Sequence, residues 1–399
     1  MAKNIVTGVE LFAGGGGLLL GSELAGVKHI AAVEWDQWAC QTIRENAAAD
    51  FPLVRDINVI EGDVRDVNWF AALKEETVDV VTGGPPCQPF SLGGLARSAE
   101  DPRDMFPAMT ETIAKLQPKA FVVENVRGLT RANFVDYLEY IKLRLSHPLL
   151  RSLEGETWRE HGARLQKEHT SIQSDLSYNL VTSVVNAADY GIPQQRHRVF
   201  IIGFRSDVDA EWSFPETTHS GSALAEAQLD SDYWERRKVR KSDRIHINRK
   251  IVNDGKLPWR TVRDALEGMP EPKPGKDSPR GWFDHRFQPG AKIYPGHTGS
   301  PIDQPAKALK AGGHGVPGGE NMIRFPDGSV RYFTIREAAR LQTFPDEYRL
   351  HGAWSEAMRQ IGNAVPVGLA EIVMSSVCEH LTKVTSVNSG RQLGLGLVV

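Results

Sequence analysis

The sequence is poor in cysteine, and the three cysteines that it has stand far apart. Cys40, Cys87 and Cys378 form no CxxC pair, which excludes a disulfide framework and a cysteine-based zinc site. Any cysteine chemistry must therefore come from one thiol acting alone. The sequence also lacks an apolar run near the ~20 residues that a membrane helix needs, and its N-terminus lacks a signal-peptide layout. We expect a cytoplasmic protein with no membrane partner.

A strong net charge is absent as well, since 47 Lys and Arg stand against 50 Asp and Glu. The balance is uneven along the chain. Residues 1–200 hold 20 basic and 26 acidic side chains, whereas the stretch from Tyr233 to Lys310 holds 18 basic and 9 acidic ones. That stretch is basic enough to bind a polyanion. Within it, the run ERRKVRKSDRIHINRK is either a surface that faces this polyanion or a solvated charged segment.

The remaining composition is that of an ordinary soluble chain of two or three domains, with 41% hydrophobic residues among 399. In the N-terminal half, short apolar runs alternate with helix-like stretches, which predicts a parallel sheet with crossover helices. These runs end at Ala13, Glu34, Gly83 and Glu124, and each is followed by a polar or Gly/Pro-rich turn. Two further runs, LVTSVVNAADY and RVFIIGF, predict neighbouring strands.

The alternation stops at about Arg205 and returns at about Val330. Between them Pro, Gly, His and basic residues predominate, which predicts a smaller, loop-rich domain. Helices are expected again at TIREAARLQTFP, where Thr334 and Glu337 form a capping box, and at GLAEIVMSSVCEHL. The predicted organisation is a main domain of residues 1–204 and 331–385, a second domain of 205–330 and a flexible tail of 386–399.

Unusual residues gather at the turns after the predicted strands, where α/β proteins bind ligands. The turn FAGGGG follows the first strand, and Glu34 ends the second. This pattern binds a ribose in nucleotide folds, although a tight turn beside a solvated Glu has the same sequence. Trp35 could stack on an adenine or be an ordinary half-buried aromatic residue. Asp63 could accept a hydrogen bond from an adenine amino group or cap a helix.

The most informative stretch is GGPPCQPFS. Two prolines fix the backbone before Cys87, and the Gly- and Ser-rich segment that follows could close over a substrate. A free cysteine is usually a small buried hydrophobe, but this position favours a nucleophile. Glu124, at the end of another strand, would face the thiol or cap a helix. Arg196 and Arg198 share one face of a strand, either in the site or in solvent.

In this order, these stretches resemble the DNA (cytosine-5)-methyltransferases. The matching motifs are ELFAGGGGLLLG, VEWD, GDV, GGPPCQPFS, ENV, the Gln194-x-Arg196-x-Arg198 run, REAARLQTFPD and QIGNAVP. Each motif alone is weak, but eight in order are specific. The resemblance spans Val9 to about Leu369, apart from the middle of the second domain. It implies an α/β, Rossmann-like S-adenosylmethionine-dependent methyltransferase core with a smaller, loop-rich target-recognition domain.

The resemblance implies transfer of a methyl group to carbon 5 of a cytosine in a specific duplex DNA sequence. Cys87 would attack carbon 6, with Glu124 at N3 and the exocyclic amine, Arg198 at O2 and Arg196 in support. The target base must leave the duplex stack for this attack. No metal takes part. Double-stranded DNA would be the partner of a monomer, in a restriction-modification system whose endonuclease, if present, is a separate chain.

The resemblance also implies a cofactor site for S-adenosylmethionine. Glu34 would bind the ribose hydroxyls and Trp35 the adenine, with Asp63 and Val64 at the edge of the adenine. The rest of the site would consist of Phe12, Gly14, Gly16, Gly17, Pro86, Asn363, Ala364 and Val365.

Two other functions fit part of the sequence. An RNA cytosine-5 methyltransferase of the same family would share the motifs, but such relatives have a compact recognition region, unlike residues 205–330. A non-catalytic DNA-binding paralogue would have lost the cysteine or the cofactor turn, and both are intact. The sequence departs from the family at Glu10, where Asp is usual. It also has a long charged segment around residues 146–174, which predicts a helical excursion.

Overall fold

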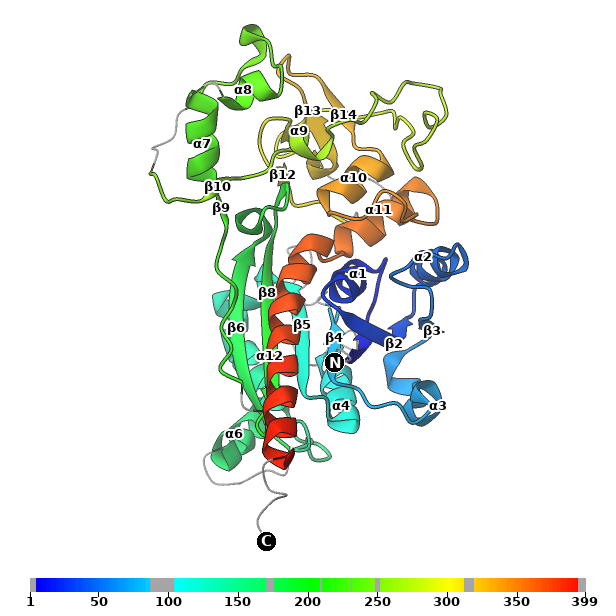
Figure 1. The fold of residues 1–399 in the computed structure, drawn as a ribbon, viewed down its shortest axis with the longest axis vertical. Coiled ribbons are helices and arrows are strands. Elements are labelled where there is room, and N and C mark those ends of the chain that lie inside the picture. Colours follow the sequence, from blue (N-terminus) through cyan, green and yellow to red (C-terminus); the bar gives the residue numbers. More distant parts are fainter. Residues whose placement is uncertain are drawn as a thin grey trace.

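A computed structural model of the chain describes residues 5–86, 104–169, 176–208, 210–230, 232–247, 252–311 and 319–393. Its centre is a seven-stranded sheet with the order β3-β2-β1-β4-β5-β8-β6 (Figure 1). The first five strands of this order are parallel, and β8 runs antiparallel to both β5 and β6. The strands are β1 (Val6–Leu11), β2 (Val27–Glu34), β3 (Asn58–Glu61), β4 (Val80–Gly83), β5 (Ala120–Val126), β6 (Tyr178–Asn186) and β8 (His197–Arg205).

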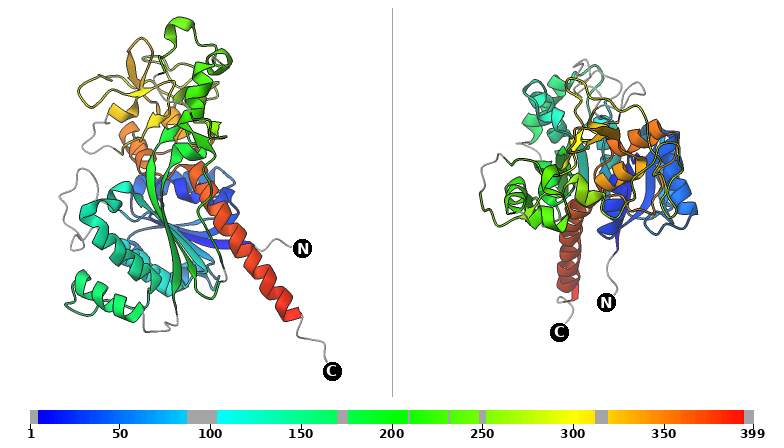
Figure 2. Two further views of the ribbon diagram at one scale, coloured as in Figure 1. Left: turned by 90° about the vertical axis from the view of Figure 1, so that its left-hand side faces the viewer. Right: turned by 90° about the horizontal axis from the view of Figure 1, so that it is seen from above.

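Helices cover both faces of this sheet, as in Rossmann-like folds. In Figure 2, left, the teal helices α4 to α6 lie on one side of the sheet and the red helix α12 on the other. Side chains alternate along β1, so Val9 packs with the α4 and α5 residues while Val6 packs with those of α12. The helices around the sheet are α1 (Gly17–Leu24), α2 (Gln37–Ala48), α3 (Trp69–Leu73), α4 (Phe106–Leu116), α5 (Val135–Ser146), α6 (Trp158–His169) and α12 (Val367–Leu393).

The predicted strands are present, with small shifts at their ends. β2 and β4 end at Glu34 and Gly83, as the turn residues predicted. β1 already ends at Leu11, because the glycine turn begins there, and β5 continues to Val126. The pairing of β6 with β8 confirms the two neighbouring strands predicted near residue 200. α6 confirms the helix predicted in the charged excursion.

A second part of the chain lies beyond one end of the sheet and is built of short elements (Figure 1). One of its strands, β12, pairs with β7, which comes directly before β8 and so connects this part to the sheet. Its elements are α7 (Gly221–Leu229), α8 (Asp232–Arg236), α9 (Val262–Ala265), β7 (Gln194–Gln195), β9 (His219–Ser220), β10 (Leu257–Pro258), β11 (Ser300–Pro301), β12 (Ala306–Lys307), β13 (Met322–Arg324) and β14 (Val330–Tyr332).

Two helices lie between the sheet and the second part, namely α10 (Ile335–Leu341) and α11 (Trp354–Asn363). Thr334 and Glu337 form the predicted capping box at the start of α10. One hydrophobic cluster includes residues of α1, α2, α10, α11 and the second part. The two parts therefore share buried apolar surface through these helices.

The C-terminal helix corrects two expectations. We expected a flexible tail from residue 386, but α12 continues to Leu393; residues 394–399 lie outside the described ones. We also expected no segment apolar enough to span a membrane, yet the stretch from Trp354 to Lys383 passes that test by length and composition. Its apolar window is 67% buried inside the protein. Burial against the sheet accounts for its hydrophobicity, as in a core helix.

Candidate active site

The turn after β1 has a backbone that favours glycine. Phe12, Gly14 and Gly16 have φ values of 57°, 52° and 91°, in the left-handed region where a side chain is unfavourable. α1 begins at Gly17, and a Cβ atom at this position would lie 2.3 Å from the carbonyl oxygen of Val365. The structure thus brings the predicted glycine turn and the predicted C-terminal residues into direct contact.

Asn363 and Ala364 complete this C-terminal segment. Asn363 is the last residue of α11, and the Ala364 carbonyl accepts a hydrogen bond of 3.2 Å from the buried side chain of Gln342. The Ala364 methyl group also lies against the glycine turn, 2.9 Å from the place of a Cβ on Gly17. The segment is held in position from both sides, although sequence reasoning did not assign a role to Gln342.

Glu34, at the end of β2, connects its strand to the glycine turn. One carboxylate oxygen accepts the Gly14 N–H at 2.7 Å, and the other accepts the N–H groups of Trp35 and Asp36, each at 2.8 Å. Burial raises the pKa of this carboxyl, and the three backbone hydrogen bonds oppose that effect. Trp35 stands beside it with 74% of its surface exposed. An exposed indole next to a carboxylate suits a flat ligand that carries hydroxyl groups.

Asp63 follows β3 at the same edge of the sheet. Its side chain caps the short turn Val64–Asp66 and accepts hydrogen bonds from the backbone and the guanidinium of Arg65. The Arg65 side chain holds the pKa of Asp63 below its usual range. Val64 is buried next to it. Capping, one of the two alternatives that the sequence left open, is what this carboxylate does in the structure.

The predicted nucleophile, Cys87, lies outside the described residues, and Pro86 is the last residue described before it. The backbone that leads to it is held from β5. Asn125 donates a hydrogen bond of 3.1 Å from its side chain to the carbonyl of Pro85. Asn125 belongs to the ENV motif, but the sequence alone assigned no role to it. A polar side chain at the end of a buried strand was the available signal, because buried amides need partners.

Glu124 and Arg198 face each other from the adjacent strands β5 and β8. Nε of Arg198 lies 2.5 Å from Oε1 of Glu124, and the glutamate is buried. Burial raises the pKa of Glu124, while the positive charge of Arg198 lowers it. On its other side, Oε2 lies 3.1 Å from the place where a Cβ of Gly84 would be. A carboxyl in this setting can give up or accept a proton, and the guanidinium can bind a carbonyl oxygen.

The side chain of Arg196 makes different contacts from that of Arg198. It is 1% exposed, and its guanidinium donates hydrogen bonds of 3.0 Å to the carbonyl of Leu309 and 2.6 Å to that of Gly362. It therefore connects the start of β8 to the second part and to α11. Its positive charge also lowers the pKa of Glu124, after burial and Arg198. We infer that Arg196 supports the site through position and charge rather than through direct contact with a substrate.

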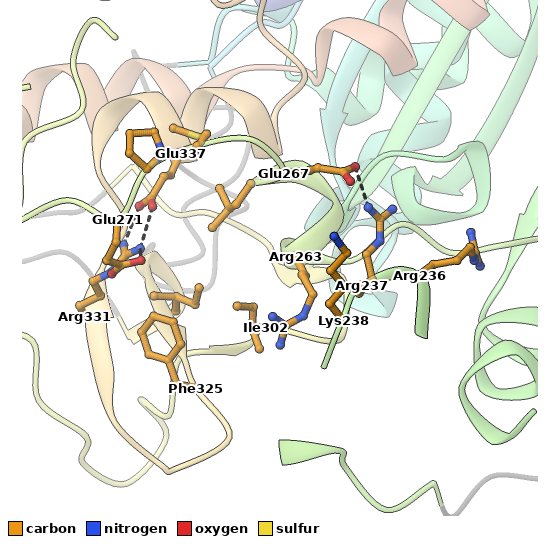
Figure 3. A pocket seen from close by; sticks show the side chains of 14 residues that line it. Arg236, Arg237, Lys238, Arg263, Glu267, Glu271, Ile302, Phe325, Arg331 and Glu337 are labelled. Atoms are coloured by element: carbon orange, nitrogen blue, oxygen red, sulfur yellow. Dashed lines mark hydrogen bonds and ion pairs between the residues drawn. The ribbon is translucent and has the colours of Figure 1, made fainter. Parts of the chain in front are cut away.

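A hollow of about 380 Å³ lies in the second part, and none of the predicted site residues lines it (Figure 3). Arg236, Arg237 and Lys238 stand on one side of it and Arg331, paired with two carboxylates, on the other. Arg237 pairs with Glu267 at 2.6 Å, whereas Lys238 has no carboxylate partner in the part of the chain that the structure describes. Some of the positive charge in this region is therefore used inside the protein, and some is available to a ligand.

The chain is similar to known proteins over nearly its whole length. Residues 6–147 and 159–379 match the C-5 cytosine-specific DNA methylase family. Type II methyltransferase M.Eco47II of Escherichia coli is 33% identical over 397 residues, covering 96% of this chain and 81% of that protein. Type II methyltransferase M.NgoFVII of Neisseria gonorrhoeae is 29% identical, covering 94% of this chain and 88% of that protein.

Solved structures show the same fold at lower sequence identity. A DNA modification methyltransferase encoded within an Escherichia coli prophage has a TM-score of 0.59 at 22% identity, covering 94% of this chain and 99% of that chain. The S. pombe Dnmt2 methyltransferase has a TM-score of 0.56 at 17% identity, with the same coverage. The unmatched residues 148–158 fall in the excursion that the sequence identified as unusually long.

The role of Arg196 in connecting the parts can be tested by Arg196→Met. This change leaves two buried carbonyls without their donor, so we expect the free energy of unfolding to fall by about 2 to 4 kcal/mol. Urea denaturation would measure the loss. Arg359→Met is the control, because Arg359 is 48% exposed and its partners among the described residues are the partly exposed carboxylates of Asp36 and Glu356; it should cost less than about 0.5 kcal/mol. Equal losses in the two variants would contradict the connecting role.

Proposed function

Because the chain belongs to the C-5 cytosine-specific DNA methylase family and is a DNA (cytosine-5-)-methyltransferase, we propose that it modifies one cytosine of a specific duplex sequence through a covalent Cys87 adduct. The observation that carries this proposal is the buried pair of Glu124 and Arg198. The pair lies at the sheet edge where Asn125 holds the backbone that leads to Cys87. A thiol, a carboxyl and a guanidinium at one edge are the groups that activate a cytosine ring.

S-adenosylmethionine is the proposed cofactor, and the residues present fit it. The glycine turn leaves room for a ligand at the N-terminus of α1. Glu34 would accept hydrogen bonds from the ribose hydroxyls, and the exposed face of Trp35 would stack on the adenine. Val64 would lie at the edge of that ring, as would Asp63. When bound, the cofactor supplies an electrophilic methyl group on a sulfonium.

The chain's own residues make the cytosine a nucleophile. The Cys87 thiolate adds to carbon 6, while Glu124 gives its proton to N3 and Arg198 binds O2. This addition turns the ring into an enamine, whose carbon 5 takes the methyl group. A base then removes the proton from carbon 5, the thiolate leaves as the carbon 5–carbon 6 double bond re-forms, and N3 returns its proton to Glu124. A positive group such as Arg198 would favour the ionised form of the thiol.

Carbon 6 cannot be approached from above or below while the base is stacked in the duplex. The target cytosine must therefore turn out of the helix, which costs a few kcal/mol and is offset by contacts with the protein. We propose residues 205–330 as the target-recognition domain that supplies part of these contacts. The relatives are type II methyltransferases, which supports duplex DNA as the substrate rather than RNA. We also propose a restriction-modification role in the cytoplasm, for a monomer whose cognate endonuclease would be a separate chain.

The covalent step is tested by Cys87→Ser. We expect the variant to fold and to bind S-adenosylmethionine, but methyl transfer should fall by several orders of magnitude because a hydroxyl is a much weaker nucleophile at neutral pH. Duplex DNA with 5-fluorocytosine at the target should trap a denaturant-resistant adduct with the wild type, since fluorine blocks the last elimination. Near-normal turnover by the variant, or no adduct with the wild type, would refute the covalent mechanism.

The cofactor site is tested by Trp35→Ala. Loss of the aromatic surface should weaken S-adenosylmethionine binding by about 1 to 3 kcal/mol, and DNA affinity should stay nearly constant. Isothermal titration with each ligand separates the two effects. Phe70→Ala, which removes another exposed aromatic side chain, is a matched control. A similar loss for both ligands would indicate general destabilisation instead of a cofactor contact.

The basic run of the second part is tested by neutralising Arg236, Lys238, Arg240 and Lys241 together. The two lysines lack carboxylate partners among the described residues, and the two arginines have exposed intrahelical or local pairs of little energetic value. Each lost phosphate contact should lower the slope of log affinity against log salt by about 0.9, without changing the sequence that is methylated. Arg237 stays unchanged because it pairs with carboxylates. An unchanged slope would place the DNA surface elsewhere.

A further inference from the structure

A line of polar side chains runs through the core beneath the proposed active site. It begins with Glu23 on α1, whose Oε1 lies 2.9 Å from Nδ1 of His29 on β2 and also accepts the His29 backbone N–H at 2.7 Å. Nε2 of His29 lies 3.8 Å from Oε2 of Glu10 on β1. The hydroxyl of Thr82 on β4 donates a hydrogen bond to the same oxygen. The reaction steps proposed above use none of these groups.

The central members of this line of polar side chains are buried within the sheet. Glu10 is 1% exposed and His29 3%, and the imidazole occupies space that Gly8 leaves open. A Cβ on Gly8 would lie 3.3 Å from the ring. Burying two ionisable groups is costly unless they are paired, so an arrangement of this kind needs its partners in place.

Glu10 is a buried carboxyl without a hydrogen-bonded cation among the described residues. Nε2 of His29 is 3.8 Å from Oε2 of Glu10, too far for a hydrogen bond, and it has no hydrogen-bond partner among those residues. The hydrogen bond that the Glu10 carboxyl accepts comes from the neutral Thr82 hydroxyl. Such a setting favours an uncharged carboxyl. Burial raises the pKa of Glu10 to about 8, with the charge of Glu124 adding to the rise and the Thr82 hydrogen bond opposing it. At neutral pH, Glu10 therefore holds the proton.

The register of the sheet puts Glu10 and Glu124 on the same face of the sheet. Glu10 is paired with Thr82 and Thr82 with Val122, and Glu124 is two residues beyond Val122. Because alternate residues of a strand share a face, all four side chains point to one face of the sheet. Gly84 lies on that face without a side chain, and the Glu124 carboxyl leans over it, toward β1.

We propose that Glu10 is a positioning residue for methyl transfer, because a buried and uncharged Glu10 leaves Glu124 without a negative neighbour when Glu124 gives its own proton to N3 of cytosine. This inference rests on the proposed function. Among the described residues, the other charged groups around Glu10 and Glu124 are Arg198 on β8, Arg196 just before it, and Glu23 on α1. Two carboxylates side by side in a buried site cannot both ionise cheaply. The charge of Glu10 therefore controls how easily Glu124 becomes a carboxylate.

The test compares the pH dependence of single-turnover methyl transfer, with labelled S-adenosylmethionine and saturating duplex DNA, in wild type and in Glu10→Gln. Above about pH 8 wild-type Glu10 ionises and opposes the charge on Glu124, whereas glutamine cannot ionise. The ratio of the rates at pH 9 and pH 7 should therefore be about tenfold lower in wild type, since one pH unit above a pKa leaves about a tenth of the group protonated. If altered packing lowers the rate of the variant by the same factor at both pH values, that factor cancels in the ratio.

Thr82→Val provides a second variant. It removes the hydrogen bond that lowers the pKa of Glu10, so the midpoint of the wild-type pH dependence should move to higher pH. Thr112→Val is the matched control, because its buried hydroxyl bonds only to the Ala108 carbonyl of its own helix. The midpoint should not move in this control. Equal pH ratios in wild type and Glu10→Gln, or equal shifts in the two threonine variants, would overturn the inference.

A readout that does not depend on activity is the stability difference between Glu10→Gln and wild type. The pKa of Glu10 lies at 4.5 in the unfolded chain and near 8 in the fold, so wild type loses stability as pH rises through this window and the glutamine variant does not. The difference should grow from pH 5 to pH 8 in urea denaturation. A difference in unfolding free energy that stays constant with pH would show that Glu10 is not protonated in the folded protein. Absence of methylation by wild type at every pH would refute the proposed function, whereas methylation with an unchanged ratio refutes only the role of Glu10.

Discussion

Two hydrogen bonds from the buried guanidinium of Arg196 hold the architecture together. They reach Leu309 in the second part and Gly362 in α11, and Arg196 itself stands at the entrance of β8. The next arginine on this strand, Arg198, is thereby presented to Glu124 across the antiparallel β5 and β8 pair. A buried cation satisfied by carbonyls from distant segments costs desolvation, but it permits only one arrangement of those segments.

The sequence was sufficient to predict most of the main sheet, because strands that end in Gly, Pro or acidic turns leave a clear pattern. It also predicted that residues 363–365 return to the glycine turn, through the resemblance to a family rather than through periodicity. The contacts of Arg196 with the carbonyls of Leu309 and Gly362 were not predictable, since they depend on partners more than a hundred residues away. Nor was the continuation of α12 to Leu393, because a polar, Gly-containing segment carries no strong helix signal.

For the candidate site, the sequence could suggest which residues take part but not what surrounds their side chains. Glu124 and Arg198, both named as site residues, lie next to each other, but no pattern in the sequence indicated that Gly84 makes room for the carboxyl or that Asn125 holds Pro85. The buried line from Glu23 to Glu10 was also hidden, because its members look like ordinary strand and helix residues until the register brings them together. Burial and register are three-dimensional properties, and they determine the proton affinity of a carboxyl more than its neighbours in sequence do.

The contact between Gly17 and the Val365 carbonyl also has a consequence for how the protein is made. The proposed cofactor site combines residues 12–17 with residues 363–365, which are about 350 positions apart in the sequence. A ribosome adds about 5 to 20 residues per second, and N-terminal segments fold first. The nascent sheet must therefore wait, without a complete pocket, until α11 has left the ribosome exit tunnel. Chains that stop before residue 365 would carry the glycine turn without its C-terminal contact, so the proposed cofactor site would form only in chains translated beyond that residue.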